Sequence, residues 1–411
     1  MIVVVECGAM RSKESLPPSV WVLLAAAFSI AMGFGLIAPV LPQFANSMAK
    51  EVFPDAAVTA TSVVVSAFAV FRLLWATPAG SLVSKFGEKA IYIVGVFTVA
   101  ASSALTAFAQ NYWQLLVFRS LGGVGSVMFT VSAMGLLIRI APPHMRGRVS
   151  ALYGAMFMIG NMVGPVFGGT LAEFGVAVPF LLYAGALLIA GIIMWAKMPS
   201  TSPTRTTGGV AASAPMTLAE AFRDRAFLAN IPGLFGHGWA NFGVRTALVP
   251  LFIAAVVSDK AWVAGTALAL FAIGTALALP FASTFADRHG RKPMIMGGLA
   301  AAGVFTIMLG FTASMWLTLP LCLLAGFGAG MFNPASQAVT ADVIGGDRSA
   351  GKVVASTQMM TDVGSIVGPL AAGAIADAMG FGWAFGITGA ILLLGALAWI
   401  GTPDTLRRTY S

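Results

Sequence analysis

Hydrophobic residues fall into twelve long runs that are separated by short polar connections. Each run holds about 20 residues, the length at which an α-helix crosses the hydrocarbon core of a bilayer. The pattern predicts an all-α integral membrane protein with twelve transmembrane helices. The expected spans are 19–42, 57–80, 89–109, 112–138, 149–171, 177–197, 227–254, 262–284, 293–312, 315–339, 353–376 and 382–401.

The longest polar connection, residues 198–226, divides the spans into six and six. Its first part is rich in Ser, Thr, Gly and Pro, which is typical of a flexible linker. Thr217 and Glu220 have the spacing of a capping box, so a short interfacial helix should precede the seventh span. The expected domains are a cytoplasmic N-terminal segment (1–18), an N-terminal six-helix bundle (19–197), a cytoplasmic linker (198–226), a C-terminal six-helix bundle (227–401) and a cytoplasmic tail (402–411).

Composition supports a membrane protein, because 58% of the 411 residues are hydrophobic and only 9% are charged. A soluble domain carries about 25% charged residues. Of the 23 Lys and Arg residues, eighteen fall on the side that bears both termini, two on the other side and three within spans. This bias predicts a multi-pass protein of the cell (inner) membrane with both termini in the cytoplasm. The net charge of +8 thus orients the chain, and we expect no nucleic-acid partner.

The sequence offers few groups for metal, redox or catalytic chemistry. Its two cysteines cannot form a disulfide framework, and its three histidines lack metal-ligand spacing. Paired carboxylates, a Ser/His/Asp set and a nucleotide-binding loop of the G-x-x-x-x-G-K-[ST] type are also absent from the sequence. We expect no metal, no cofactor and no enzymatic activity, and we expect the chain to be monomeric.

The two halves share motifs at one fixed offset of 203–204 residues. Four matches in the same order imply two copies of one six-helix unit. The matches are GSLVSKFGEK (80–89) with STFADRHGRK (283–292), RGRV (146–149) with AGKV (350–353), GNMVGPVFGG (160–169) with GSIVGPLAAG (364–373), and Glu173 with Asp377.

The motifs resemble those of the major facilitator superfamily, and within it the twelve-span drug:proton antiporter group. GFGLIAPVLPQF (33–44) resembles the first-span signature of that group, and RSLGGVGS (119–126) resembles its fourth-span motif with an embedded arginine. GNMVGPVFGG matches the antiporter motif G-x-x-x-G-P-x-x-G-G at every defined position. The resemblance covers essentially the whole chain and implies two bundles around a central substrate path.

GSLVSKFGEK resembles the family's loop motif G-x-L-a-D-r-x-G-r-k, with two departures. Ser84 stands where Asp is usual and Glu88 where Arg is usual. The second copy keeps the family's charges, so the resemblance implies that the cytoplasmic gate depends mainly on the second half. The expected gate residues are Gly80, Gly87, Lys89, Asp287, Arg288, Gly290, Arg291 and Lys292.

The glycine–proline motifs lie in spans five and eleven, where three small residues recur every four positions on one helix face. Missing side chains let a neighbouring helix approach closely, and proline bends a helix. We therefore predict a tight seam between the two halves, although glycine and proline are also common in membrane helices generally. The seam residues are Gly160, Gly164, Pro165, Gly168, Gly169, Gly364, Gly368, Pro369 and Gly373.

Ionisable residues within spans mark a candidate pathway, because charge in the membrane is costly. Asp362 is the only acidic residue placed well inside a span, and it is either a proton site or a permanent partner of an arginine. Resemblance implies a proton-transfer or charge-balancing role for Arg119. His237, Asn241 and Arg245 lie on one helix face, which we expect to face the central cavity. Arg72 completes the candidate set.

The sequence thus favours a proton-coupled exporter of a small amphipathic or apolar compound, such as a drug or secondary metabolite. Its partners are a small-molecule substrate, protons and the lipid bilayer. The alternative is a proton symporter that imports a small nutrient or organic anion, with the arginines as anion ligands.

Overall fold

The computed structural model describes residues 16–142, 145–198, 216–344 and 351–406. The predicted N-terminal segment, linker and tail lie partly outside these residues, which contain helices and no strand. The first eight α-helices are α1 (Pro18–Ile37), α2 (Leu41–Val52), α3 (Ala57–Leu74), α4 (Ala76–Phe86), α5 (Glu88–Ala107), α6 (Tyr112–Ile140), α7 (Arg146–Leu171) and α8 (Ala177–Lys197). The others are α9 (Leu218–Ala221), α10 (Arg225–His237), α11 (Arg245–Phe252), α12 (Ala261–His289), α13 (Arg291–Leu309), α14 (Met315–Ile344), α15 (Gly351–Met379) and α16 (Phe381–Leu397).

Every predicted span corresponds to a helix or a run of consecutive helices. Eleven stretches of the described residues are long and apolar enough to cross a membrane, and the twelfth, α16, is a shorter apolar helix of 17 residues. The seventh span combines α10 and α11 with two π-helical segments, η4 (Gly238–Val244) and η5 (Ile253–Val257). The predicted capping box is confirmed at α9, where Thr217 and Glu220 each accept a hydrogen bond from the other's backbone amide.

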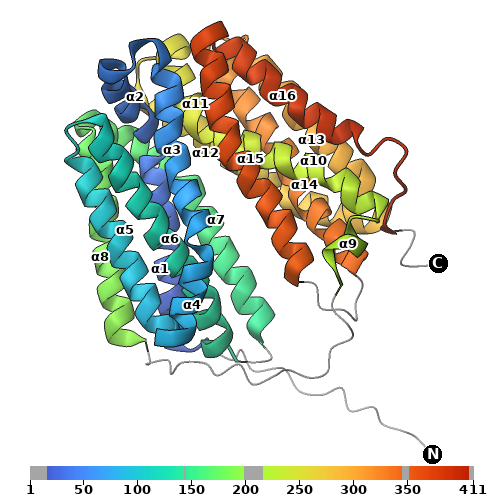
Figure 1. The fold of residues 1–411 in the computed structure, drawn as a ribbon, viewed down its shortest axis with the longest axis horizontal. Helices are drawn as coiled ribbons and strands as arrows, with labels where there is room; N and C mark the ends of the chain where they lie inside the picture. The colour runs from blue at the N-terminus through green and yellow to red at the C-terminus, as the bar shows by residue number, and fades with distance from the viewer. Residues whose placement is uncertain (1–15, 143–144, 199–215, 345–350, 407–411) are drawn as a thin grey trace, which may run out of the picture.

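The helices form two bundles, α1–α8 and α9–α16 (Figure 1). The repeat is visible in their packing, because glycines separated by 203 residues make the same helix contact. A Cβ on Gly95 would lie 2.8 Å from the carbonyl oxygen of Gly125, and a Cβ on Gly298 would lie 2.8 Å from that of Gly328. Backbone therefore meets backbone between α5 and α6, and again between α13 and α14.

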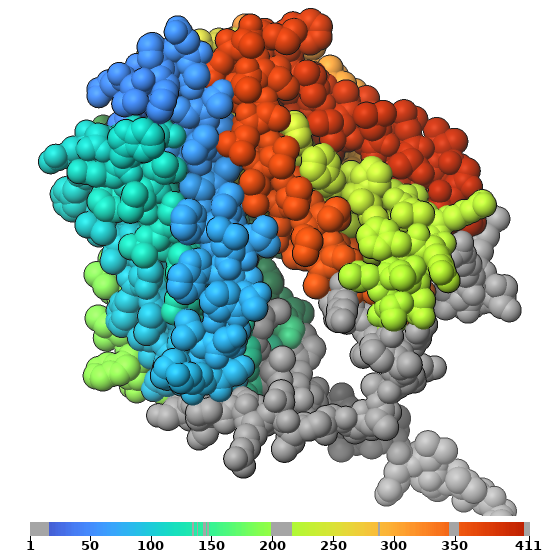
Figure 2. Space-filling view, in the orientation of Figure 1, coloured from blue at the N-terminus to red at the C-terminus, as the bar shows by residue number. Residues whose placement is uncertain are grey.

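The two bundles meet at one end and separate toward the other (Figures 1 and 2). We call the end where α3 begins and α15 ends the closed end. The opposite end, where α1 begins and α8 ends, is the open end, and Figure 2 shows the surface hollowed between the bundles there. Across the bundles, α3 packs against α15 and α7 packs against α12.

Candidate functional site

The contact between α3 and α15 closes one side of the closed end with polar bonds. The Asp377 carboxylate accepts hydrogen bonds from the backbone amides of Val58 and Thr59 at 3.0 and 2.7 Å. It also accepts the Thr59 hydroxyl proton at 2.6 Å. Further along the same contact, the Ser66 hydroxyl donates to the carbonyl oxygen of Ile366 at 3.2 Å. The α15 helix thereby caps the first turn of a helix that belongs to the other bundle.

The contact between α7 and α12 depends on glycine, and no hydrogen bond joins these two helices in the part of the chain that the structure describes. A Cβ on Gly169 would lie 2.8 Å from the carbonyl oxygen of Ala261, and a Cβ on Gly265 would collide with the carbonyl oxygen of Pro165. On the α3–α15 side, a Cβ on Gly373 would lie 2.6 Å from the Ser62 hydroxyl. Gly169 and Gly373, both predicted seam residues, therefore lie where the two bundles touch.

The other predicted seam glycines pack within their own bundles, so their predicted position between the halves is wrong. Side chains at Gly160, Gly164 and Gly168 would collide with the backbone of α1. In the second copy of the motif, Gly364 and Gly368 likewise face a helix of their own bundle, the seventh span. A small-residue face specifies close approach but does not choose the neighbour. Of the two prolines, Pro369 lies against Gly243 of its own bundle, whereas the ring of Pro165 lies against Gly35 and its carbonyl oxygen faces Gly265 of the other bundle.

Arg72 and Asp362 lie on opposite bundles, at the point where α3 and α15 begin to separate. They follow the Ser66–Ile366 contact toward the open end by six and four residues, or about 9 and 6 Å along their helices. Arg72 is exposed and Asp362 is half-buried, and Asp362 acts electrostatically on Arg72. Gln358 donates a hydrogen bond to Asp362 Oδ1 at 3.0 Å. Arg72 and Asp362 therefore lie on facing helices at the point where the two bundles separate.

Arg119, by contrast, lies inside the N-terminal bundle. It is only 6% exposed, and its guanidinium carbon stands 4.8 Å from the centre of the Phe68 ring. Tyr183 lies close enough to interact electrostatically with Arg119. The Arg119 Nε is buried without a hydrogen-bond partner in the described residues. The structure therefore does not bring Arg119 together with Arg72 and Asp362.

The polar stripe of the seventh span lies inside the C-terminal bundle, so the expectation that it faces the central cavity is wrong. His237 is 7% exposed and packs against the Phe332 ring. The Asn241 side-chain nitrogen and His237 Nδ1 are 2.8 Å apart, and Arg245 Nε donates to the Asn241 carbonyl oxygen at 2.8 Å. These two hydrogen bonds link the three residues along one helix face, which lowers the cost of placing them inside the bundle.

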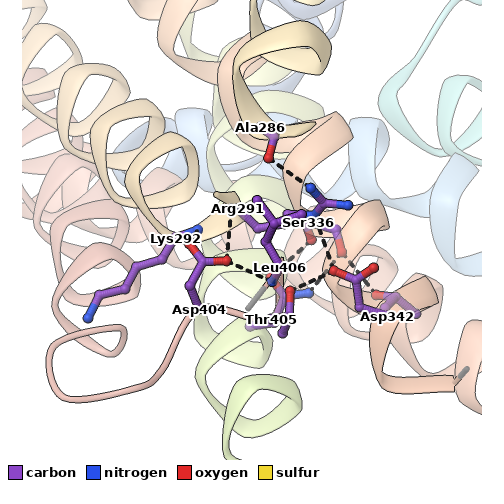
Figure 3. A network of polar contacts seen from close by, with 10 residues as sticks. Ala286, Arg291, Lys292, Ser336, Asp342, Asp404, Thr405 and Leu406 are labelled. Atoms are coloured by element: carbon purple, nitrogen blue, oxygen red, sulfur yellow. Dashed lines mark hydrogen bonds and ion pairs between the residues drawn. The ribbon is translucent and has the colours of Figure 1, made fainter. Parts of the chain in front are cut away.

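The second loop motif forms a compact network within its own bundle (Figure 3). Arg291 Nε pairs with Asp342 at 3.1 Å, and Asp404 accepts the backbone amides of Arg291 and Lys292, each at 3.1 Å. Asp404 thereby caps α13, and Gly290 precedes that helix with a φ of +112°, which favours glycine. Arg288 is exposed, and the side chain of Asp287 lies outside the described residues.

The first loop motif is anchored in the same way but with opposite charges. Glu88 pairs with Arg139 at 3.0 Å, exactly one repeat offset before the Arg291–Asp342 pair. Lys89 donates to the carbonyl oxygen of Met198, Gly87 has a φ of +83°, and a Cβ at Gly80 would meet open space. The sequence marks Glu88 as unusual but does not by itself identify Arg139 as its partner. The 203-residue offset between Arg139 and Asp342, which also differ in charge, was the available signal.

These observations define a membrane transporter: two copies of one helical unit meet at one end and separate toward the other, with Arg72 and Asp362 where the separation begins. The chain belongs to the Major Facilitator Superfamily, whose family model matches residues 23–259 and 235–410. The resemblance inferred from the motifs is thereby confirmed.

Curated relatives cover most of the chain at low identity. The chain is 28% identical over 383 residues to the class C tetracycline resistance protein of Escherichia coli, across 92% of this chain and 93% of that protein. It is 26% identical over 362 residues to the quinolone resistance protein NorA of Staphylococcus aureus, across 87% of this chain and 90% of that protein. These relatives share the family and the span of the chain.

Solved structures share the fold. A bacterial homologue of the human lysosomal transporter Spinster, in an inward-facing and occupied conformation, aligns with a TM-score of 0.77 at 16% identity, over 96% of this chain and 98% of that chain. The human organic anion transporter MFSD10 (TETRAN) aligns with a TM-score of 0.63 at 18% identity, over 93% of this chain and 99% of that chain.

Proposed function

We propose that this transporter exports a small amphipathic or apolar compound in exchange for protons. The observation that carries the proposal is the position of Asp362 opposite Arg72, where the two bundles separate. An ionised Asp362 attracts Arg72 and favours closing the open end, whereas protonation removes that attraction. Substrate binding that displaces the proton would therefore promote closure behind the substrate. A proton gained from the other side would allow the return.

The relatives support the direction and the substrate class. Their names associate them with resistance to tetracycline and to quinolones, both small compounds. A proton crossing 100 mV releases about 2.3 kcal/mol, which sustains a gradient of roughly fifty-fold for a neutral substrate. Membrane potential alone could thus drive export against a concentration gradient.

The proposed topology places the open end and both termini in the cytoplasm of the cell that makes the protein. The positive-inside bias supports this orientation, since Arg139, Lys197 and Arg291 lie at or near the open end. The proposed domains are the two six-helix bundles with residues 198–226 as their linker, and the proposed unit is a monomer. In this orientation the loop motifs flank the cytoplasmic opening as gate residues, each anchored to its own bundle.

The test is transport into everted membrane vesicles with an acidic interior, with tetracycline and a quinolone as probes. An exporter accumulates a probe in the vesicles and releases protons to the outside as it does so. Asp362→Asn should abolish proton-driven accumulation, whereas Asp259→Asn, an exposed carboxylate in the loop after η5, should not. Unchanged coupling in Asp362→Asn would remove the proposed proton carrier.

The alternative is a symporter that imports a small nutrient or organic anion, and the three arginines within spans are the observation that favours it. Only Arg72 faces the space between the bundles, because Arg119 and Arg245 lie inside them. Transport in the same everted vesicles distinguishes the exporter from the symporter. A symporter would drive a preloaded organic anion out of an acidic interior, whereas the exporter would retain its probe.

A further inference from the structure

An apolar groove runs between α13 and α16 on the outer surface of the C-terminal bundle. Toward the closed end the two helices touch, since a Cβ on Gly303 would lie 2.8 Å from the carbonyl oxygen of Gly389. Toward the open end they leave a groove lined almost entirely by apolar atoms. Gly297 and Leu397 are exposed in it, so it opens on the surface that faces lipid. Its wall consists of Met296, Gly297 and Ala300 on α13, and of Leu393, Ala396 and Leu397 on α16.

The corresponding place in the N-terminal bundle is filled by an aromatic ring. Phe97 on α5 lies 203 residues before Ala300, which is one repeat offset. A Cβ on Gly191 of α8 would lie 2.8 Å from the Phe97 ring. A phenylalanine therefore packs between α5 and α8 where an alanine stands between α13 and α16. The groove is a feature of the second bundle and not a consequence of the repeated six-helix unit.

A lysine is held at the end of the groove that lies toward the open end. Lys292 precedes Met296 by about one helical turn and lies on the same face of α13. Its Nζ donates a hydrogen bond to the carbonyl oxygen of Thr402, which follows α16, at 3.0 Å. Figure 3 shows its side chain extending away from the Arg291–Asp342 pair. An ammonium group has three donors, and among the described residues no carboxylate forms an ion pair with Lys292.

The other charges at this end leave the site positive. The Asp404 carboxylate faces the backbone, where it accepts the amide protons of Arg291, Lys292 and Leu406. Arg291 pairs with Asp342, whereas Arg288, at the end of α12, is exposed and adds positive charge. An anion is therefore favoured beside the Lys292 ammonium.

The groove and the lysine together define an occupant with two parts. The apolar wall at membrane depth accepts a hydrocarbon chain, and the ammonium at the membrane surface attracts an anionic headgroup. We infer that this groove binds an anionic phospholipid, phosphatidylglycerol, with one acyl chain between α13 and α16 and its phosphate on Lys292. Its single negative charge matches a single ammonium. The site is separate from the space between the bundles and does not depend on what the protein transports.

Native mass spectrometry of the purified full chain tests the inference, with phosphatidylglycerol and phosphatidylcholine of the same acyl chains added in turn. The unmodified protein should bind its first phosphatidylglycerol about fivefold more tightly than phosphatidylcholine, the effect expected of one basic residue near an anionic headgroup. Lys292→Gln should lose this preference.

Lys89→Gln is the matched control for the lysine. Lys89 donates to the carbonyl oxygen of Met198 as Lys292 does to that of Thr402, but in its bundle the Phe97 ring takes the place of the groove. This variant should keep the preference for phosphatidylglycerol. An equal loss in Lys89→Gln and Lys292→Gln would show a general effect of charge and overturn the inference.

Two further variants test the groove while Lys292 stays in place. Ala300→Phe introduces the side chain that the N-terminal bundle carries at the equivalent position. Gly297→Leu fills the groove from an open position, since a Cβ there would meet only Met331, at 3.7 Å. Both variants should weaken binding of the first phosphatidylglycerol.

Three other outcomes would each overturn the inference. One is equal affinity for the two lipids in the unmodified protein, and another is a preference retained in Lys292→Gln. The third is unchanged binding in both groove variants. A dimer of the chain that Ala300→Phe dissociates would overturn it as well, because the groove would then hold a second copy of the protein.

Discussion

Asp377 on α15 caps Thr59 at the start of α3, and the two residues belong to different bundles. The carboxylate accepts the Thr59 amide proton at 2.7 Å and its hydroxyl proton at 2.6 Å. Glu173, the repeat counterpart of Asp377, is exposed and forms no hydrogen bond within the described part of the chain. The closed end is therefore held asymmetrically, by a helix cap on one side and by glycine contact on the other. This cap must break when the closed end opens.

Removing the cap should expose the first turn of α3 to solvent. We expect Asp377→Ala to speed hydrogen exchange of the Val58 and Thr59 amides by about 2- to 30-fold, because a helix N-cap contributes about 0.5–2 kcal/mol. Hydrogen–deuterium exchange with mass spectrometry of peptides covering 57–62 measures this directly.

Glu173→Ala is the control for the cap, since its side chain bonds to no helix start in the described residues. Exchange at the start of α12, the helix beside Glu173, should stay unchanged in that variant. If Asp377→Ala left the α3 amides as protected as before, the cap would not be what holds the closed end.

Substitutions at two glycines of the repeated glycine–proline motif should have different effects, one on stability and one on transport. Gly164→Ala should lower Tm, because its Cβ would push α1 away from α7 within one bundle. Overpacking of this kind costs about 1–3 kcal/mol. Gly373→Ala, at the contact between bundles, should instead impair transport with little loss of Tm, since each bundle keeps its own packing. Equal loss of Tm in both variants would argue against separate roles.

The loop motifs should tolerate exchange of their charges but not loss of the pair. Arg291→Glu alone should lower stability by about 1.5–3 kcal/mol, the range for hydrogen bonds that involve charged groups. Arg291→Glu combined with Asp342→Arg recreates the arrangement of Glu88 and Arg139 and should recover most of that loss. Thermal unfolding of the single and double variants forms the cycle, and a double variant no better than the single one would contradict it.

The cap at the second loop motif should matter for the C-terminal bundle alone. Asp404→Ala removes the acceptor for the amides of Arg291 and Lys292 and should cost about 0.5–2 kcal/mol. Exchange of the α13 amides should rise, whereas exchange of the α5 amides in the other bundle should not. Asp55→Ala, which changes an exposed carboxylate of the first bundle, should leave both unchanged.

Much of the fold could be predicted because the bilayer constrains length and polarity so strongly. Twelve apolar runs correspond to the observed helices, although α16, with 17 residues, is shorter than its predicted range of 382–401. The capping box at Thr217 was also predictable, because it depends on local spacing. Helix partners were not, because Gly164 and Gly169 look alike in sequence yet face different bundles.

By itself, the sequence determined the number of spans, the duplication and the family, because these follow from periodicity and from motifs that recur at a fixed offset. Only the tertiary structure decided which charge within a span meets which neighbour. Arg72 faces Asp362 across the bundles, whereas Arg119 and Arg245 lie inside them on phenylalanine rings. The reason is that an apolar helix presents several equally apolar faces, so the rotation of each helix is fixed by its packing and not by hydropathy.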